Sequence, residues 1–338
     1  MADAATNALL NAHLDRRRFE EAYAVACGAG CGSRRSEALS LVGQRLVRLD
    51  LEDVRLHDHP ELWRELPQGL RSAAGAVSFP GRHTRSRGAL SSFVPLYRAM
   101  FEAARIRWDN GQTLHFLSIV HLLAEFAGHL AWETALGHAA DPVQMVELVD
   151  RRDSRWGDPD DQECAHHRSQ RRVAEKVRDG LPMRSDEQWQ RFLREEFSRL
   201  GEMLTVCATR DGRRVAGSSV RDCRADCAVW AAVPVPLREH QRGRARLALL
   251  LSRSSIVQLR HSAPIGHFFG VPSIDEIELE WADVVRQARR LADLDVGSGD
   301  LVDQLRMYCS AIAGTPLKPA TTIGRIADQL RDEWTTTG

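Results

Sequence analysis

The sequence predicts a mainly α-helical protein with a helical N-terminal half and a mixed α+β C-terminal half that carries a small antiparallel β element. Apolar residues recur at helical spacing through most of the chain. Residues that favour helix ends stand at the borders of many of these segments. A short stretch around Asp211-Gly212 breaks the helical pattern and is typical of a hairpin turn. The expected division is a helical domain over 1–150 and an α+β domain with C-terminal helices over 151–338.

Composition limits the classes of function. The 338 residues include 46 basic and 46 acidic side chains, so no net charge draws the whole protein to nucleic acid or to a membrane. No segment has the roughly 18–20 consecutive apolar residues that span a bilayer. The N-terminus lacks the pattern of a signal peptide, and the seven cysteines are an odd number. These features predict a cytoplasmic protein with reduced thiols.

The first helical pattern covers residues 5–26 and is interrupted by three consecutive arginines. Glycines at 28, 30 and 32 end it, and a second pattern at 36–49 completes a predicted helical hairpin. Pro60 suits the first turn of the next helix, which carries Trp63 among its apolar residues. The segment 78–92 reads as a loop.

Two helices are predicted at 93–107 and 112–136, the second ended by Gly137 as a left-handed cap. A short helix to Val149 follows. The charged, turn-rich stretch 150–161 is the predicted linker.

The C-terminal half is expected to begin with helices at 161–179 and 185–204. The hairpin around Asp211-Gly212 then combines with strands at Ala228–Val235 and Leu247–Leu251 in a small sheet. Three helices are predicted to close the chain, the first opened by a capping box formed by Ser273 and Glu276; they cover 273–292, 300–313 and 321–334.

Four ionisable residues stand at intervals of four within the 112–136 helix: His121, Glu125, His129 and Glu133. This spacing puts neighbours on one face, although each step turns about 40° further round the helix. His121, Glu125 and His129 are therefore a candidate metal site if a second helix adds a carboxylate. The spacing departs from the Glu-x-x-His motif of carboxylate bundles. The alternative is a solvated face stabilised by Glu–His pairs.

Other clusters have weaker patterns. Acidic, Cys and His residues gather over 160–167, where a helix N-terminus explains the acidic ones. The pairs Cys27-x-x-x-Cys31 and Cys223-x-x-x-Cys227 would supply four zinc ligands, although zinc knuckles usually have two intervening residues. Buried thiols are the alternative interpretation.

Nucleic-acid contacts are predicted from basic residues. Arg82, Arg85 and Arg87 fall in the 78–92 loop, where guanidinium groups would meet phosphates. The segment 251–259 resembles the turn and recognition helix of a helix-turn-helix, and 267–273 resembles the closing helix of such regulators. Only 12 residues separate Ile256 from Phe268, too few for the helix that should intervene, so both resemblances cannot hold.

No nucleotide-binding glycine motif, nucleophile elbow or zinc-protease motif occurs. The sequence thus favours a cytoplasmic, helical binding or regulatory protein whose partner is a protein or a nucleic acid. The alternative is an enzyme that uses a divalent metal at the His/Glu site of the 112–136 helix. The partner's identity and the oligomeric state do not follow from the sequence.

Overall fold

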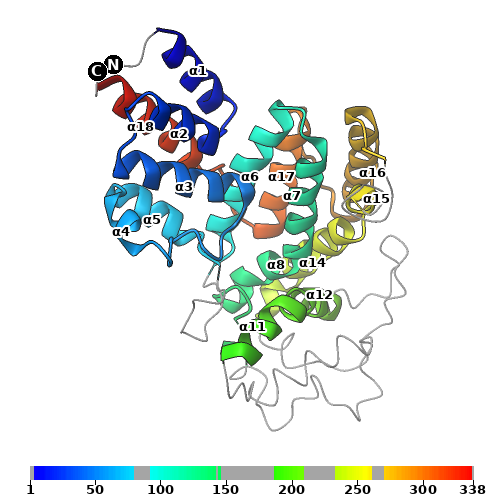
Figure 1. Cartoon of the computed structure of the whole chain (residues 1–338). Helices are drawn as coiled ribbons and strands as arrows, with labels where there is room; N and C mark the ends of the chain where they lie inside the picture. Colours follow the sequence, from blue (N-terminus) through cyan, green and yellow to red (C-terminus); the bar gives the residue numbers. More distant parts are fainter. Residues whose placement is uncertain are drawn as a thin grey trace. The chain divides into compact units, whose positions relative to one another are not determined.

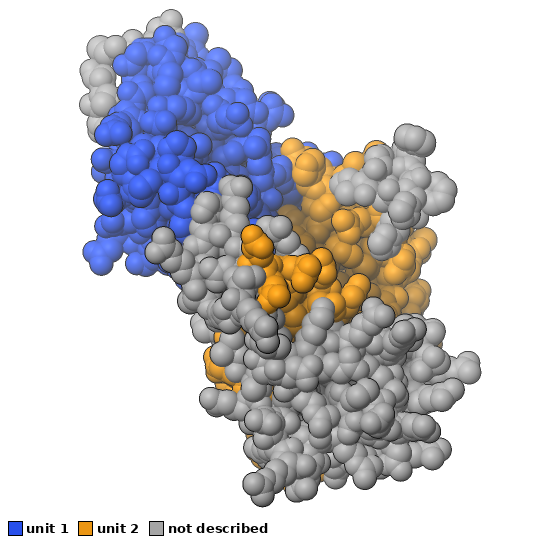
Figure 2. Space-filling model, turned by 60° about the horizontal axis from the view of Figure 1, so that its bottom comes forward, with its two compact units in different colours: residues 1–83, 95–111, 319–338 blue, residues 84–94, 112–318 orange. Residues whose placement is uncertain are grey.

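The structure is a computed structural model that describes residues 4–79, 92–141, 144–145, 186–208, 233–260 and 270–336. These residues form helices joined by turns (Figure 1). They divide into two compact units, coloured separately in Figure 2. Unit 1 comprises residues 1–83, 95–111 and 319–338, and unit 2 comprises residues 84–94 and 112–318.

Unit 1 is a helical bundle assembled from both ends of the chain. Helix α3 packs against α2, α4 and α18, so the last helix lies among the first ones in sequence, as Figure 1 shows in red and blue. The helices that contribute to this unit are α1 (Ala4–Asp15), α2 (Phe19–Gly28), α3 (Arg34–Arg48), α4 (Pro60–Glu65), α5 (Gln68–Ala76), α6 (Val94–Asp109) and α18 (Thr322–Thr336).

Helix α3 shows why this bundle forms where the sequence predicts. Ser33 caps its N-terminus in a reciprocal pair with Ser36, which satisfies two otherwise unpaired backbone groups. Leu39, Val42 and Leu46 form its buried stripe. The predicted helix at 36–49 is therefore confirmed.

Helix α18 is fixed to unit 1 by apolar burial and by one carboxylate. Ile326, Leu330 and Trp334 are buried at the helical spacing of four residues. Oε1 of Glu102 accepts a hydrogen bond from the Gly324 backbone N–H at 3.0 Å. This contact satisfies one of the donors that every helix leaves unpaired at its start.

Unit 2 is organised around α8, which packs against α12, α14 and α17. Side-chain hydrogen bonds to backbone carbonyls join these helices: Gln241 donates to Ala131 O at 3.0 Å, and Thr134 donates to Ala313 O at 3.1 Å. The helices of this unit are α7 (Thr113–Glu125), α8 (Ala127–Leu136), α11 (Asp186–Glu195), α12 (Phe197–Ala208), η1 (Val235–Leu237), α14 (Arg238–Ser252), α15 (Ser255–Leu259), α16 (Ile274–Ala292) and α17 (Leu301–Ala313).

The crossing of α8 and α12 depends on two glycines. A Cβ atom added to Gly128 would overlap the backbone carbonyl group of Gly201 and lie 2.7 Å from Thr205 Oγ1. The two backbones are thus in direct contact, with no room for a side chain between them.

The predicted antiparallel β element is wrong. Within the described residues there is no strand: Leu247–Leu251 lies inside α14, 204–208 closes α12, and Val235 begins the turn η1. The apolar run at 247–251 is buried at every position, and such a short run does not distinguish a strand from a buried helix. The Asp211-Gly212 turn lies outside the described residues.

Several predicted helix borders are confirmed. Ser273 and Glu276 form the capping box that opens α16, and Gly137 ends α8 with a φ of +76°. The predicted 112–136 helix is divided at Phe126, whose φ of −95° and ψ of 4° interrupt it between α7 and α8. The 150–161 linker and the boundary between 1–150 and 151–338 lie outside the described residues and stay predictions.

One described segment, Thr113–Leu136, is long and apolar enough to cross a membrane by composition alone. Of its most apolar window, 61% is buried inside the fold. Most of this window is therefore packed against other parts of the described structure.

Candidate ligand-binding pocket

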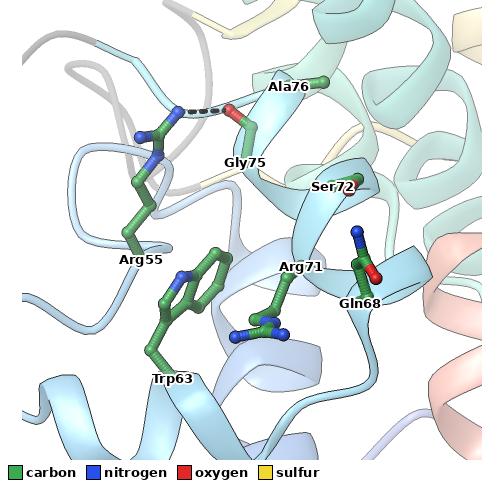
Figure 3. A pocket seen from close by; sticks show the side chains of 7 residues that line it. All are labelled: Arg55, Trp63, Gln68, Arg71, Ser72, Gly75 and Ala76. Carbon is green, nitrogen blue, oxygen red and sulfur yellow. Dashed lines mark hydrogen bonds between the residues drawn. The ribbon is translucent and has the colours of Figure 1, made fainter.

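A pocket of about 560 Å³ lies on unit 1, where α4, α5 and the segment before them meet (Figure 3). Its volume falls in the range of small-ligand sites, roughly 300–1,000 Å³. It is wide open to solvent and is lined by Arg55, Trp63, Gln68, Arg71, Ser72, Gly75 and Ala76.

The corner between α4 and α5 positions this lining. Pro60 is the first residue of α4, because proline suits the first turn of a helix. Pro67 is the residue just before α5, and proline there cannot continue α4. The buried residues Leu62 and Leu70 anchor the two helices in the bundle. Trp63 and Arg71 follow these anchors by one residue each and therefore line the border between core and solvent.

Helix α5 presents one stripe to the pocket. Gln68, Arg71, Ser72, Gly75 and Ala76 recur at intervals of three and four residues, which places them on one face. Ser72, Gly75 and Ala76 are small residues, so they leave space on this face of α5.

The segment before α4 is held by Asp53, a nearly buried carboxylate. Arg45 Nη2 lies 2.7 Å from its Oδ2, and its backbone carbonyl accepts from Leu56 N at 2.9 Å. This turn presents Arg55, whose Nη2 donates to Gly75 O at 3.0 Å (Figure 3). Because a carbonyl carries no net charge, Arg55 keeps its full positive charge at the pocket.

The other donors of the pocket have no partner among the described residues. Among the residues that the structure describes, the side chains of Trp63, Gln68, Arg71 and Ser72 make no hydrogen bond or ion pair. None of the seven lining residues is acidic. The pocket thus offers two guanidinium groups, an indole, an amide and a hydroxyl.

This combination suits an anionic ligand that carries a planar group. Guanidinium groups bind phosphate or carboxylate through pairs of N–H donors. An indole face accepts stacking from a base or contact from a cation. Figure 3 shows Arg55, Trp63 and Arg71 reaching the same hollow from three different segments.

The structure separates the His/Glu residues of the predicted metal site. His121 and Glu125 pair on α7 with Nε2 and Oε2 3.6 Å apart, and both side chains are partly exposed. His129 follows the break at Phe126 and is completely buried. Within the described parts of the chain, no group of three or more His, Cys, Asp or Glu side chains is arranged to hold a metal.

His129 occupies the core of unit 2. Its Nε2 lies 2.7 Å from Phe197 O and its Nδ1 lies 3.2 Å from Ala139 O. Phe93 stacks on the ring with centroids 5.3 Å apart, and the tilted ring of Phe197 lies against it with centroids 4.2 Å apart. Burial lowers the pKa of His129 to about 4, although both carbonyl groups act in the opposite direction.

Glu133, the fourth residue of the series, binds backbone instead of metal. Its Oε2 accepts from Phe93 N at 2.7 Å, and its Oε1 accepts from the Ser92 hydroxyl. The carboxylate therefore caps the chain just before α6 begins.

The remaining predicted sites are described in part. Arg82, Arg85, Arg87, the 160–167 cluster and the Cys223/Cys227 pair lie outside the described residues. The 251–259 segment contains the turn and short helix α15, whose Ile256 and Val257 are buried. Helix α15 packs against α7 and α16, so its apolar face faces the core.

The sequence predicts Trp63 on an apolar helix face and does not predict the pocket. One signal was available: Gln68, Arg71, Ser72 and Gly75 repeat at helical spacing beside the apolar stripe. The approach of Arg55 to this stripe depends on the irregular turn at 50–59, which has no periodic pattern.

No protein-family model, curated protein or solved structure matches the chain. Its function is therefore inferred from the chemistry of the pocket.

Proposed function

We propose that the protein is a cytoplasmic binding protein with a regulatory role, and that its pocket on unit 1 receives one nucleotide of a single-stranded nucleic acid. The base stacks on Trp63, and Arg71 meets the adjacent phosphate. The observation that carries this proposal is the pairing of Trp63 with Arg71 in an open pocket without a carboxylate, where both side chains lack partners among the described residues.

A nucleic acid explains this lining better than an acidic or phosphorylated peptide. Phosphopeptide recognition relies on a cluster of arginines around one phosphate. Here the arginines accompany an aromatic face, the combination that binds unpaired bases with little sequence preference. The open shape suits one unit of a long ligand, whereas a metabolite site usually buries 70–90% of its ligand.

The phosphate contacts predicted from the sequence for Arg82, Arg85 and Arg87 lie outside the described residues and stay a separate prediction. A cytoplasmic location is supported by the free thiols of Cys27, Cys31 and Cys309 and by the partial burial of the apolar segment Thr113–Leu136. The metal-enzyme alternative has no supporting observation within the described residues, because both ring nitrogens of His129 face carbonyl groups.

The test is fluorescence anisotropy of a labelled 12-nucleotide single strand over a salt series. Trp63→Ala should weaken binding by about 5- to 150-fold, since stacking contributes about 1–3 kcal/mol per base. Arg71→Ala should weaken binding and lower the slope of log K against log salt by about 0.7, the value for one phosphate on a single strand.

Arg16→Ala is the matched control, because Arg16 is an exposed arginine of unit 1 that does not line the pocket. It removes the same charge and should leave both affinity and slope nearly unchanged. Equal effects of Arg16→Ala and Arg71→Ala would show that the nucleic acid binds through general electrostatic attraction and not through the pocket. Binding of a phosphopeptide, but not of the single strand, would assign the pocket to a protein partner.

A further inference from the structure

The turn between α2 and α3 carries two cysteines on either side of a helix-ending motif. Gly30 adopts a φ of +73°, which a residue without a side chain does at little cost. Its N–H donates to Cys27 O at 3.0 Å, and Cys31 N–H donates to Ala26 O at 2.9 Å. This pair of bonds defines a Schellman motif, which folds the chain back over the last turn of α2.

The motif brings both thiols to the same place. Cys31 Sγ donates to Ala26 O at 3.2 Å, and that carbonyl belongs to the peptide bond of Cys27. Cys27 Sγ lies 2.8 Å from the position that a Cβ on Gly32 would take, and Gly32 is bonded to Cys31. Each sulfur therefore lies near the residue next to the other cysteine.

Both thiols are accessible, which separates them from the third described cysteine. Cys27 is exposed and Cys31 is half-buried, whereas Cys309 is completely buried. In the described parts of the chain these two thiols belong to no larger group of potential metal ligands.

We propose that Cys27 and Cys31 form a reversible disulfide, with a low-molecular-weight disulfide such as oxidised glutathione as the oxidant. The exposed Cys27 thiolate attacks the oxidant, forms a mixed disulfide and releases one thiol. The Cys31 thiolate then attacks the Cys27 sulfur and releases the second thiol. Two protein thiols are oxidised, and one external disulfide is reduced to two thiols.

Local geometry favours this product. A disulfide needs Cα atoms about 4.4–6.8 Å apart. The Schellman turn returns Cys31 to the end of the helix that carries Cys27, so ring closure requires side-chain rotation and little movement of the backbone. The disulfide would lie in the turn that precedes α3, whereas the pocket is built by α4 and α5, which follow α3. Its formation does not depend on the proposed nucleic-acid site.

The test uses the full-length native protein in mixtures of reduced and oxidised glutathione, with acid quenching, alkylation and trypsin digestion. The tryptic peptide Phe19–Arg34 contains Cys27 and Cys31 and no other cysteine. It should appear two hydrogen atoms lighter, without bound glutathione. In Cys31→Ser the same peptide should instead retain one glutathione on Cys27.

The role of the turn is tested by two substitutions at Gly30. Asn tolerates the left-handed conformation, so Gly30→Asn should oxidise like the parent. The β-branched side chain in Gly30→Val disfavours the left-handed conformation. The ratio of disulfide to dithiol should therefore fall by five-fold or more at a fixed ratio of reduced to oxidised glutathione. The same fall is expected when the parent is unfolded in urea.

A native peptide that carries two glutathiones, or that stays reduced where other cysteines oxidise, overturns the proposal. So does equal oxidation of the native and urea-unfolded protein. If zinc co-purifies with the parent and is lost in Cys27→Ser, the two cysteines form a metal site and the disulfide proposal is wrong.

Discussion

At the scale of single residues, the neutral His129 ring faces two carbonyl oxygens but carries only one N–H proton. A neutral imidazole carries one N–H, and the shorter contact, 2.7 Å from Nε2 to Phe197 O, indicates which nitrogen holds it. Nδ1 then faces Ala139 O at 3.2 Å without a hydrogen between them. A second proton would satisfy both carbonyls, but its charge would be buried in an aromatic core, and this cost is larger.

Because burial lowers the pKa of His129, the free energy of unfolding should decrease as the pH falls. The pKa of His129 is about 4 in the folded protein, against 6.5 as the ordinary value. Between these values the unfolded chain binds more protons, so stability is lost as the pH falls from about 6.5 to about 4. The loss from this residue amounts to about 3 kcal/mol, at 1.36 kcal/mol per pKa unit.

Urea unfolding at pH 7.5 and pH 4.5 measures this effect. The parent should lose about 2–3 kcal/mol more between the two pH values than His129→Gln, which cannot titrate there. Carboxylate protonation affects both proteins and cancels in the difference. Equal losses in the two proteins would show that the pKa of His129 is the same in the folded and the unfolded chain.

At the scale of helices, close approach at α8 and α12 depends on glycine. Gly128→Ala forces the added methyl group into the Gly201 backbone, which cannot rotate away as a side chain would. We expect a loss of about 1–3 kcal/mol or more in the free energy of unfolding. Separation of the two helices should also disturb Thr205, which donates to Gly201 O at 2.7 Å.

Gly243→Ala is the matched control for Gly128→Ala. Gly243 also lies inside a helix, α14, but an added Cβ would meet no atom within 4 Å. The substitution should therefore stabilise the protein by about 0.5–1 kcal/mol, because alanine suits a helix interior better than glycine. Chemical denaturation of both variants measures the contrast, and a stable Gly128→Ala protein would exclude close backbone contact.

The sequence predicts helices well where a cap and a periodic stripe agree. Ser273 opens α16 and Gly137 closes α8 as expected, because both signals depend on local backbone chemistry. The sequence-based prediction is wrong where packing against other helices determines the secondary structure. The apolar run at 247–251 reads as a strand by itself and is helical because other helices surround it. His129 was grouped with polar residues, yet its place three residues after Phe126 put it on the apolar stripe.

At the scale of the whole molecule, the chain returns to its first unit twice, at residues 95–111 and again at its last helix. Helix α18 supplies unit 1 with Ile326, Leu330 and Trp334, and its Arg331 pairs with Asp15 on α1. Unit 2 has a separate core around α8. A core substitution in α18 should therefore destabilise the bundle that carries the pocket, far away in sequence, and spare the helices of unit 2.

Leu330→Ala tests this dependence by hydrogen exchange measured on peptides. Leu330 is completely buried, so its truncation should lower the local stability of unit 1 by about 2–5 kcal/mol and speed amide exchange in α3. Exchange in α14 and α17 should stay at the parental rate. Asp328→Ala is the control on the same helix. Its carboxylate is exposed and, among the described residues, pairs with Arg331 alone at 2.8 Å, which limits the effect to about 0.5 kcal/mol. If α14 and α17 exchange faster in Leu330→Ala by the same factor as α3, the two units unfold as one cooperative body, and the separation of their cores has no energetic consequence.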